Sequence, residues 1–232
     1  MKRFSDKQIR RIVGKYSVVE NQWSLADGIE IDLVEVSDRY DLLDRMIEQE
    51  GRMVRVERFP YWAEIWPASL ALANWMCVNK LPIPRGWTRE LGCGLGLLGI
   101  VMAKLGWKIE ASDYVEDALV FAAHNAQKNR VTDLHRVSYL DWSNPVGKVC
   151  ECLVASDVVY EKKNHVYLNR VLRTLLAPGG RFYLSDPKRR PAKRFVAMLV
   201  KQQYTHEVET ITQALGSVEY NVDIHTFTKG PS

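Results

Sequence analysis

Hydrophobic and polar residues follow two alternating patterns from residue 87 onward. Most of the short apolar segments, which are typical of buried strands, are followed by a longer segment with the spacing of a helix. The predicted strands cover residues 87–91, a segment ending at 112–113, 135–140, 151–156 and 181–184. The predicted helices cover residues 97–105, 115–128, 164–176 and 192–203. Strands that alternate with helices predict an α/β fold with a doubly wound, parallel sheet.

The two ends of the chain break this pattern. Residues 1–58 form a predicted N-terminal extension, with strands at 16–19 and 29–36, a turn at 26–28 between them, and a short acidic helix at 41–50. A further helix is predicted at 70–78. At the other end, residues 205–212 and 218–227 alternate as two strands joined by 213–217, which predicts a hairpin. We therefore divide the chain into an extension, residues 1–58, and one main domain, residues 59–232.

Polar and glycine residues stand directly after four of the predicted parallel strands. Gly92 follows the first, Asp113 ends the second, Asp141 and Trp142 follow the third, and Asp157 follows the fourth. Open α/β sheets bind their ligands at the carboxyl ends of the strands. The sequence therefore predicts a ligand site at this edge, independently of any single motif.

The glycine-rich segment after the first strand indicates what kind of ligand binds there. Gly92, Gly94 and Gly96 alternate with other residues, which lets the backbone turn sharply and lets a ligand approach it closely. Asp113 lies where a βαβ unit would bring a carboxylate beside this turn, ready to accept hydrogen bonds from two ribose hydroxyls. An aspartate there could equally cap the following helix. We favour a nucleoside cofactor.

Two nucleoside cofactors fit this segment at first sight. Residues 94–99 match the G-x-G-x-x-G pattern of dinucleotide sites, so an NAD-dependent oxidoreductase is one reading. Glu90 would repel a pyrophosphate, whereas it suits the ammonium group of an amino-acid moiety. The C-terminal hairpin also fits another large group of enzymes better.

That group is the class I, seven-strand S-adenosylmethionine-dependent methyltransferases. Residues 90–96, Asp113 and the turn at 176–180 resemble its motifs, and the resemblance covers residues 86–232. It implies a mostly parallel, seven-stranded, Rossmann-like sheet with a C-terminal antiparallel hairpin. It also implies S-adenosyl-L-methionine as the cofactor and S-adenosyl-L-homocysteine as the product.

A closer resemblance extends over nearly the whole main domain. Residues 59–69, 140–142 and 156–160 together resemble the protein-lysine methyltransferase-like branch, methyltransferase family sixteen. This implies N-methylation of a lysine side chain in a protein substrate, with residues 59–232 as the methyltransferase domain. Arg89 departs from the family pattern, which usually has an aliphatic residue in the first strand.

The family resemblance also implies the residues of the site. Those implied or expected to bind the cofactor are Trp66, Glu90, Gly92, Cys93, Gly94, Gly96, Asp113, Tyr114, Asp141, Trp142 and Ser156. Asp157 and Tyr160 match the family's acidic-x-x-aromatic motif beside the transferred methyl group. We expect Asp157 to hydrogen-bond and align the incoming ammonium, and Tyr160 to shape the channel.

Each of these residues also has a purely structural reading. Tyr114 could pack on the adenine or fill the core, and Trp62 could line the pocket or pack in an aromatic stripe. Asp141 could accept from the exocyclic amine of the adenine or cap a loop, and Trp142 could be a core residue. Asp157 could cap the helix that follows it.

The charge of the chain restricts the partners. The net charge is +4 over 232 residues, too small for a protein that coats nucleic acid. Residues 156–160 read Ser-Asp-Val-Val-Tyr, which differs from the Asn/Asp-Pro-Pro-Tyr type that methylates bases. The basic cluster at residues 188–194 could bind an acidic protein surface or RNA, or be a solvated loop. We do not expect a nucleic-acid substrate.

The remaining features concern compartment and alternatives. The four cysteines have no metal or disulfide spacing, and no apolar segment suits a signal peptide or a membrane span. We therefore expect a cytoplasmic monomer without a membrane partner and without a metal. Besides NAD chemistry, a small-molecule methyltransferase and a cofactor-binding module without catalysis stay open.

Overall fold

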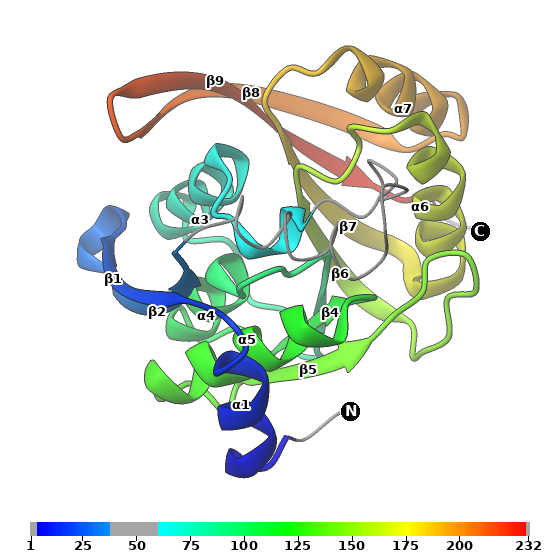
Figure 1. Ribbon diagram of the computed structural model, residues 1–232. Coiled ribbons are helices and arrows are strands. Elements are labelled where there is room, and N and C mark those ends of the chain that lie inside the picture. Colours follow the sequence, from blue (N-terminus) through cyan, green and yellow to red (C-terminus); the bar gives the residue numbers. More distant parts are fainter. Residues whose placement is uncertain (1–3, 38–59, 231–232) are drawn as a thin grey trace, which may run out of the picture.

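A seven-stranded sheet forms the centre of the computed structural model, which describes residues 4–37 and 60–230 (Figure 1). The strands lie in the order β5-β4-β3-β6-β7-β9-β8. They are β3 (Thr88–Leu91), β4 (Ile109–Asp113), β5 (His135–Tyr139), β6 (Cys150–Ser156), β7 (Leu176–Asp186), β8 (Thr205–Leu215) and β9 (Val218–Thr228). Pairing is parallel from β5 to β7, and β9 is antiparallel to both β7 and β8. The predicted doubly wound, mostly parallel sheet with a C-terminal antiparallel hairpin is confirmed.

Helices cover both faces of this sheet (Figure 1). They are α3 (Pro67–Asn79), α4 (Leu97–Lys104), α5 (Glu116–Lys128), α6 (Lys162–Leu175) and α7 (Arg190–Lys201). The first three share one hydrophobic cluster with one face of the sheet, and α6 and α7 share a second cluster with the other face. None of the helices within residues 4–37 and 60–230 is long and apolar enough to cross a membrane.

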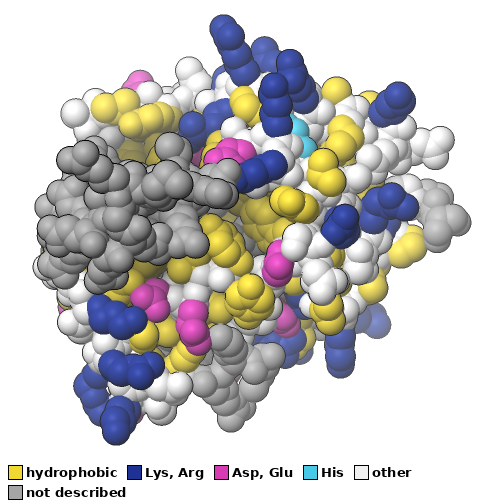
Figure 2. All heavy atoms as spheres, turned by 45° about the vertical axis from the view of Figure 1, so that its right-hand side comes forward, with side chains coloured by type: hydrophobic (Ala, Val, Ile, Leu, Met, Phe, Trp, Pro, Cys, Tyr) yellow, Lys and Arg dark blue, Asp and Glu magenta, His cyan; other side chains and the backbone are white. Residues whose placement is uncertain are grey.

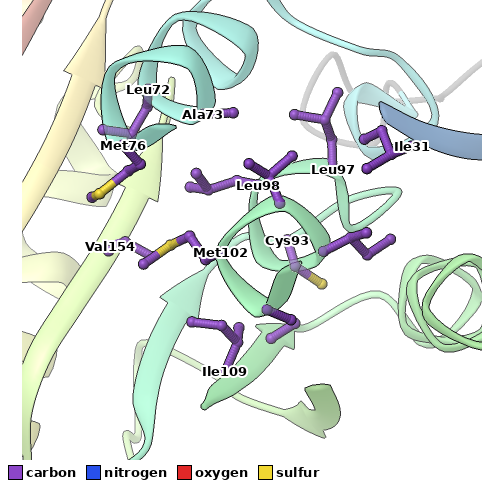
Figure 3. Packing of buried hydrophobic residues seen from close by; sticks show 14 of the residues in the cluster. Ile31, Leu72, Ala73, Met76, Cys93, Leu97, Leu98, Met102, Ile109 and Val154 are labelled. Atoms are coloured by element: carbon purple, nitrogen blue, oxygen red, sulfur yellow. The ribbon is translucent and has the colours of Figure 1, made fainter. Parts of the chain in front are cut away.

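The cluster under α3 and α4 anchors the loop that begins α4. Figure 3 shows Leu98 and Met102 of α4 packed between Met76 of α3 and Ile109 and Val154 of the sheet. All five side chains are at most 2 % exposed. Each buried side chain of this size contributes roughly 1.5–3 kcal/mol relative to an exposed position. The start of α4 is therefore fixed against the sheet, and this also fixes the end of the glycine loop that precedes it.

The N-terminal segment differs from the prediction in two places. Its elements are α1 (Asp6–Val13), β1 (Val18–Ser24), the short 3-10 helix η1 (Ala26–Gly28) and β2 (Glu30–Val36). The strand predicted at 16–19 was too short, because β1 is exposed almost throughout and lacks an alternating pattern. Helix α1 was missed, although a capping box of Ser5 and Gln8 marks its start. The helix predicted at 41–50 lies outside the described residues.

The strand predicted at 181–184 was also too short. Strand β7 begins at Leu176 and includes the Pro178-Gly179-Gly180 segment that was expected to be a turn. The Gly179 N–H donates to the carbonyl oxygen of Lys229 over 3.0 Å, and the Lys229 N–H donates to Gly180 over 2.9 Å. These bonds extend the pairing of β7 with the chain end. At its other end β7 reaches Asp186, which places a further carboxylate at the carboxyl edge of the sheet.

Arg89 is buried in β3 because it has a partner there. Its Nη2 lies 2.9 Å from Oε1 of Glu110 on the neighbouring strand, and the other oxygen of Glu110 pairs with Arg136. Burial alone would raise the pKa of Glu110, but the two arginines hold it below its ordinary value. A buried charge persists when it is paired in this way. The departure from an aliphatic residue therefore leaves β3 buried and in register.

Candidate active site

The glycine loop between β3 and α4 has backbone angles that favour glycine. Gly92, Gly94 and Gly96 have φ values of +73°, +50° and +88°. The N–H groups of Gly92 and Cys93 both donate to the carbonyl oxygen of Ser112, over 2.8 and 3.0 Å. The loop therefore turns at the carboxyl end of β3 and is tied to the end of β4.

Asp113 joins this loop to the next helix. One carboxylate oxygen accepts from the Gly94 N–H over 3.2 Å, and the other accepts from the Val115 N–H over 2.9 Å. Burial raises the pKa of this carboxyl, and the backbone N–H groups partly offset the effect. Val115, the residue before α5, has no other side-chain cap. Asp113 thus stabilises the chain before α5, and it does so at the glycine loop where the ribose site was predicted.

The chain before α3 lies against this loop. A Cβ atom built on Gly94 would lie 2.9 Å from the carbonyl oxygen of Trp62, too close for any side chain. The Trp62 ring itself packs on Tyr16 and Phe121, with ring centres 5.6 and 5.4 Å apart. Trp62 therefore follows its structural reading, an aromatic contact between the N-terminal segment and α5.

Glu90 and Cys93 have side chains in the interior beneath the loop. The Cys93 thiol lies in the cluster of Figure 3, and burial raises its pKa. Glu90 is 2 % exposed, and its Oε2 has no hydrogen-bond partner among the described residues. A Cβ on Gly99 would lie 2.6 Å from that oxygen and 3.0 Å from Nε2 of His135. Both Glu90 and His135 therefore crowd the same glycine of α4.

Burial and the neighbouring Asp113 raise the pKa of Glu90 to about 8. Between the ordinary value and about 8, the unfolded chain releases a proton that the folded protein retains, so stability falls as pH rises. Glu90→Gln removes this titration. We expect the variant to gain stability relative to the wild type between pH 5 and pH 8, on the order of 2–4 kcal/mol.

Thermal melting at the two pH values tests this. Glu219→Gln, at an exposed glutamate of the hairpin, is the matched control and should show no such gain. A difference between Glu90→Gln and wild type that is the same at pH 5 and pH 8 would contradict the assignment.

Trp142 and Asp141 both follow β5, but Trp142 borders the glycine loop whereas Asp141 is exposed to solvent. A Cβ on Gly92 would lie 3.7 Å from the Trp142 ring, so this ring borders the glycine loop. Asp141 is exposed, and its carboxylate accepts from the Ser143 N–H over 2.8 Å; the side chain and the backbone N–H of Ser143 together lower its pKa. Asp141 therefore caps a local turn, as its structural reading said. An adenine contact for either residue stays a prediction.

Tyr114 and Ser156 complete the predicted cofactor set at this edge. Tyr114 is 64 % exposed, so its alternative reading as a core residue was wrong. Ser156 is the last residue of β6 and is half-buried. Tyr114 follows β4 and Ser156 ends β6, the strands on either side of β3, so both lie at the edge where the ligand site was expected.

Asp157 forms the tightest ion pair of this edge. Its two carboxylate oxygens accept from Nε and Nη2 of Arg189, each over 2.7 Å. The carboxylate is almost wholly buried, whereas the arginine side chain is 38 % exposed. Helix α6 begins at Lys162 with no side-chain cap, so the reading of Asp157 as a helix cap was wrong.

Aromatic rings lie beside this ion pair. The Tyr61 ring centre is 5.5 Å from that of Tyr160 and 5.9 Å from that of Trp66. The Trp66 indole N–H donates to the Tyr61 carbonyl oxygen over 2.9 Å, and the Arg189 guanidinium lies 6.0 Å from the Trp66 ring centre. Burial raises the pKa of Tyr160, so its hydroxyl stays protonated. The side chains next to Asp157 thus form an apolar, aromatic wall.

Sequence reasoning missed three residues of this arrangement. Arg189 was treated only as part of a basic cluster, and its solvated reading was wrong for this residue. Asp186 was missed because β7 was predicted to end two residues early. Tyr61 stood in a quoted motif without being singled out. The rule that flagged Asp157, an acid directly after a parallel strand, would also have found Asp186.

Comparison with known proteins identifies the family to which the chain belongs. One family model, described as lysine methyltransferase, matches residues 61–202. The protein N-lysine methyltransferase METTL21A of Xenopus tropicalis is 26 % identical over 172 residues, which cover 71 % of this chain and 75 % of that protein. The ribosomal protein L11 methyltransferase of Campylobacter lari is 51 % identical over 71 residues, 30 % of this chain and 22 % of that protein.

The chain spans less than a third of the ribosomal protein L11 methyltransferases of Campylobacter, with 31 % covered in Campylobacter jejuni. Among solved structures, magnesium protoporphyrin IX methyltransferase of Synechocystis with bound SAM has a TM-score of 0.57 at 16 % identity, covering 83 % of this chain and 93 % of that one. That likeness concerns the fold. Because the family model covers more than half of the sequence, the chain belongs to the lysine methyltransferase family.

Proposed function

We propose that the protein transfers a methyl group from S-adenosylmethionine to the side-chain amine of a lysine in a protein substrate. One observation supports this above the others. In a chain of the lysine methyltransferase family, the ribose-type carboxylate Asp113 and the acidic-x-x-aromatic pair Asp157 and Tyr160 follow adjacent parts of one sheet edge. The glycine loop lies between them.

The residues present fit the cofactor. Gly92 and Gly94 carry no side chain over the loop, and Val158 and the Trp62 carbonyl oxygen lie 3.3 and 2.9 Å from where their Cβ atoms would stand, so the loop backbone is approached closely by its neighbours. Glu90 keeps an unpaired carboxylate oxygen beneath the loop. We assign the loop backbone to the methionine moiety, Asp113 to the ribose and Trp142 to the adenine. When bound, S-adenosylmethionine supplies an electrophilic methyl group on a sulfonium sulfur.

Gly94→Ala tests the loop. The substitution places a side chain at φ +50° and 2.9 Å from the Trp62 carbonyl oxygen, so the loop or the chain before α3 must move. We expect affinity for S-adenosylhomocysteine to fall by at least about tenfold, which corresponds to roughly 1.4 kcal/mol. Calorimetry measures it.

Gly216→Ala is the matched control for Gly94→Ala. Gly216 has φ +60° in the distal hairpin turn, and no atom lies within 4 Å of its built Cβ. That variant carries backbone strain without the clash. Equal losses of affinity in the two variants would contradict the assignment of the loop.

The acceptor amine must present a lone pair to the methyl carbon. A lysine amine has an ordinary pKa near 10.4, so its neutral form costs about 4–5 kcal/mol at pH 7. An apolar wall disfavours the ammonium form, and Tyr61, Trp66 and Tyr160 supply such a wall. Asp157 aligns the amine through a hydrogen bond, and positioning supplies much of the acceleration.

The substrate is identified by labelling. A cell lysate is incubated with the protein and a methyl-labelled donor, and mass spectrometry then locates the label. We expect methylated lysine in a small number of proteins. Label found only in small molecules, or on arginine or nucleic acid, would overturn the proposed substrate class.

A further inference from the structure

Asp157 has a backbone conformation that its surroundings must hold. Its φ is +50°, in the left-handed region of backbone conformation. Residues other than glycine rarely adopt this region, at a cost of roughly 1–2 kcal/mol. Its N–H donates to the carbonyl oxygen of Ser185 over 2.9 Å, which ties it to β7. The strained backbone aims the carboxylate at the segment after β7.

Arg189 meets this carboxylate with a two-point contact. Nε and Nη2 each lie 2.7 Å from a different oxygen, the geometry in which a guanidinium fixes a carboxylate both in place and in orientation. The arginine is itself held, because its backbone N–H donates to Oδ1 of Asp186 over 2.6 Å. Asp157 is therefore fixed from the side of α7 by an arginine whose backbone is itself hydrogen-bonded to Asp186.

Asp186 is a second carboxyl group close to Asp157, and Arg189 donates to both side chains. It is fully buried, and one of its oxygens has no hydrogen-bond partner among the described residues. Burial and the nearby charge of Asp157 raise its pKa to about 6. The charged or titratable groups around the two carboxyls are Arg189, Tyr160, Asp223 and Lys188, which lies 3.5 Å from Asp223. Only Arg189 among these places a cation on Asp157.

The neighbours of Arg189 in the basic cluster behave differently. Arg190, Lys193 and Arg194 are exposed on α7, where Figure 2 shows dark blue side chains gathered at the top of the molecule. The cluster is thus divided. One arginine is turned inward to the acceptor side, and its neighbours face solvent.

We propose that Arg189 is a positioning residue, which holds the Asp157 carboxylate in place and aimed at the acceptor amine. This rests on the proposed function of the site. Asp157 is held at two points by the guanidinium, and its remaining lone pairs are left for the amine. Without Arg189, the Asp157 carboxylate would lose both contacts that fix its orientation, and the buried Asp186 carboxyl nearby would repel it.

Nuclear magnetic resonance of protein labelled with ¹³C at aspartate carboxyls tests this without an acceptor. In Arg189→Met, the Asp157 carboxyl signal should move from its wild-type position at one fixed pH, because both guanidinium contacts are lost. In Arg189→Lys, which can restore one contact, it should move less. Arg190→Met, which removes an exposed charge next to it in sequence, should resemble wild type.

The transfer reaction supplies a second readout. With label transfer to lysate protein, Arg189→Met should lower kcat roughly 10- to 100-fold, as expected for a displaced catalytic group, while S-adenosylhomocysteine affinity changes less than about threefold. Arg189→Lys keeps the positive charge but cannot make the two-point contact with Asp157, so its kcat should also fall.

The outcomes separate the two proposals. An Asp157 signal in Arg189→Met that matches wild type, or the same change in Arg190→Met, would overturn the role of Arg189. The absence of protein methylation by wild type would overturn the proposed function and leave the resonance result readable. Should Arg189→Met fail to fold, Arg189→Lys carries the test, and an unchanged kcat in that variant would count against the proposal.

Discussion

Asp113→Ala is expected to weaken S-adenosylhomocysteine binding by roughly 100- to 10,000-fold. Two ribose hydroxyls donating to one carboxylate would be charge-assisted hydrogen bonds, each contributing about 1.5–3 kcal/mol. Loss of both, about 3–6 kcal/mol, corresponds to two to four factors of ten in affinity, at about 1.4 kcal/mol for each. Isothermal calorimetry with the full chain measures the change.

The same substitution also removes contacts within the protein. Asp113 accepts from the N–H groups of Gly94 and Val115, so Asp113→Ala loosens the loop and the start of α5. Asp113→Asn separates the two effects, because its amide oxygen can keep one backbone contact but cannot bind two hydroxyls as an anion. Its melting temperature without ligand should fall less than that of Asp113→Ala, and its affinity should still fall at least about tenfold. Unchanged affinity in Asp113→Asn would remove the ribose assignment.

Lowering the pH should also weaken S-adenosylhomocysteine binding to the wild-type protein. Burial raises the pKa of Asp113, so its carboxyl takes up a proton at a higher pH than an exposed aspartate does. Affinity for S-adenosylhomocysteine therefore declines as pH falls.

The order of strands and helices could be predicted because the parallel region has simple patterns. Its strands are buried on both faces, and its helices end at clear signals such as Gly106, so the predicted bounds agree closely with those of β3, β4, α4 and α5. The errors in the predicted helix and strand bounds occur in segments of which only one face, or neither face, is buried. Strand β1 is exposed, α1 is short and polar, and β7 continues through glycines that locally look like a turn.

The residues of the site also fall into those that could be predicted from the sequence and those that could not. Residues fixed by backbone geometry, the glycines and Asp113, could be predicted because the turn itself requires them. Residues fixed by tertiary contacts could not. Nothing in the local sequence distinguishes Arg189, which binds Asp157 across 32 positions, from Arg190, which faces solvent. That distinction depends on where β6 and β7 end relative to each other, and a sequence pattern does not record it.

Asp157→Asn is expected to retain S-adenosylhomocysteine affinity within about threefold while the rate of methyl transfer falls roughly 100-fold or more. The amide has nearly the same size, so the aromatic wall of Tyr61, Trp66 and Tyr160 should persist. It loses the negative charge, and with it both the two-point contact with Arg189 and the anionic acceptor for the lysine amine. Calorimetry measures the first quantity, and label incorporated into the acceptor protein measures the second.

Asp133→Asn is the matched control, at an exposed aspartate before β5 and at the opposite end of the sheet. It should match wild type in both measurements. A full transfer rate in Asp157→Asn would show that the amine is aligned by the aromatic side chains alone. A loss of cofactor affinity as large as the loss of rate would instead place Asp157 in the cofactor site, since an acceptor-side carboxylate affects transfer and leaves the bound nucleoside unchanged.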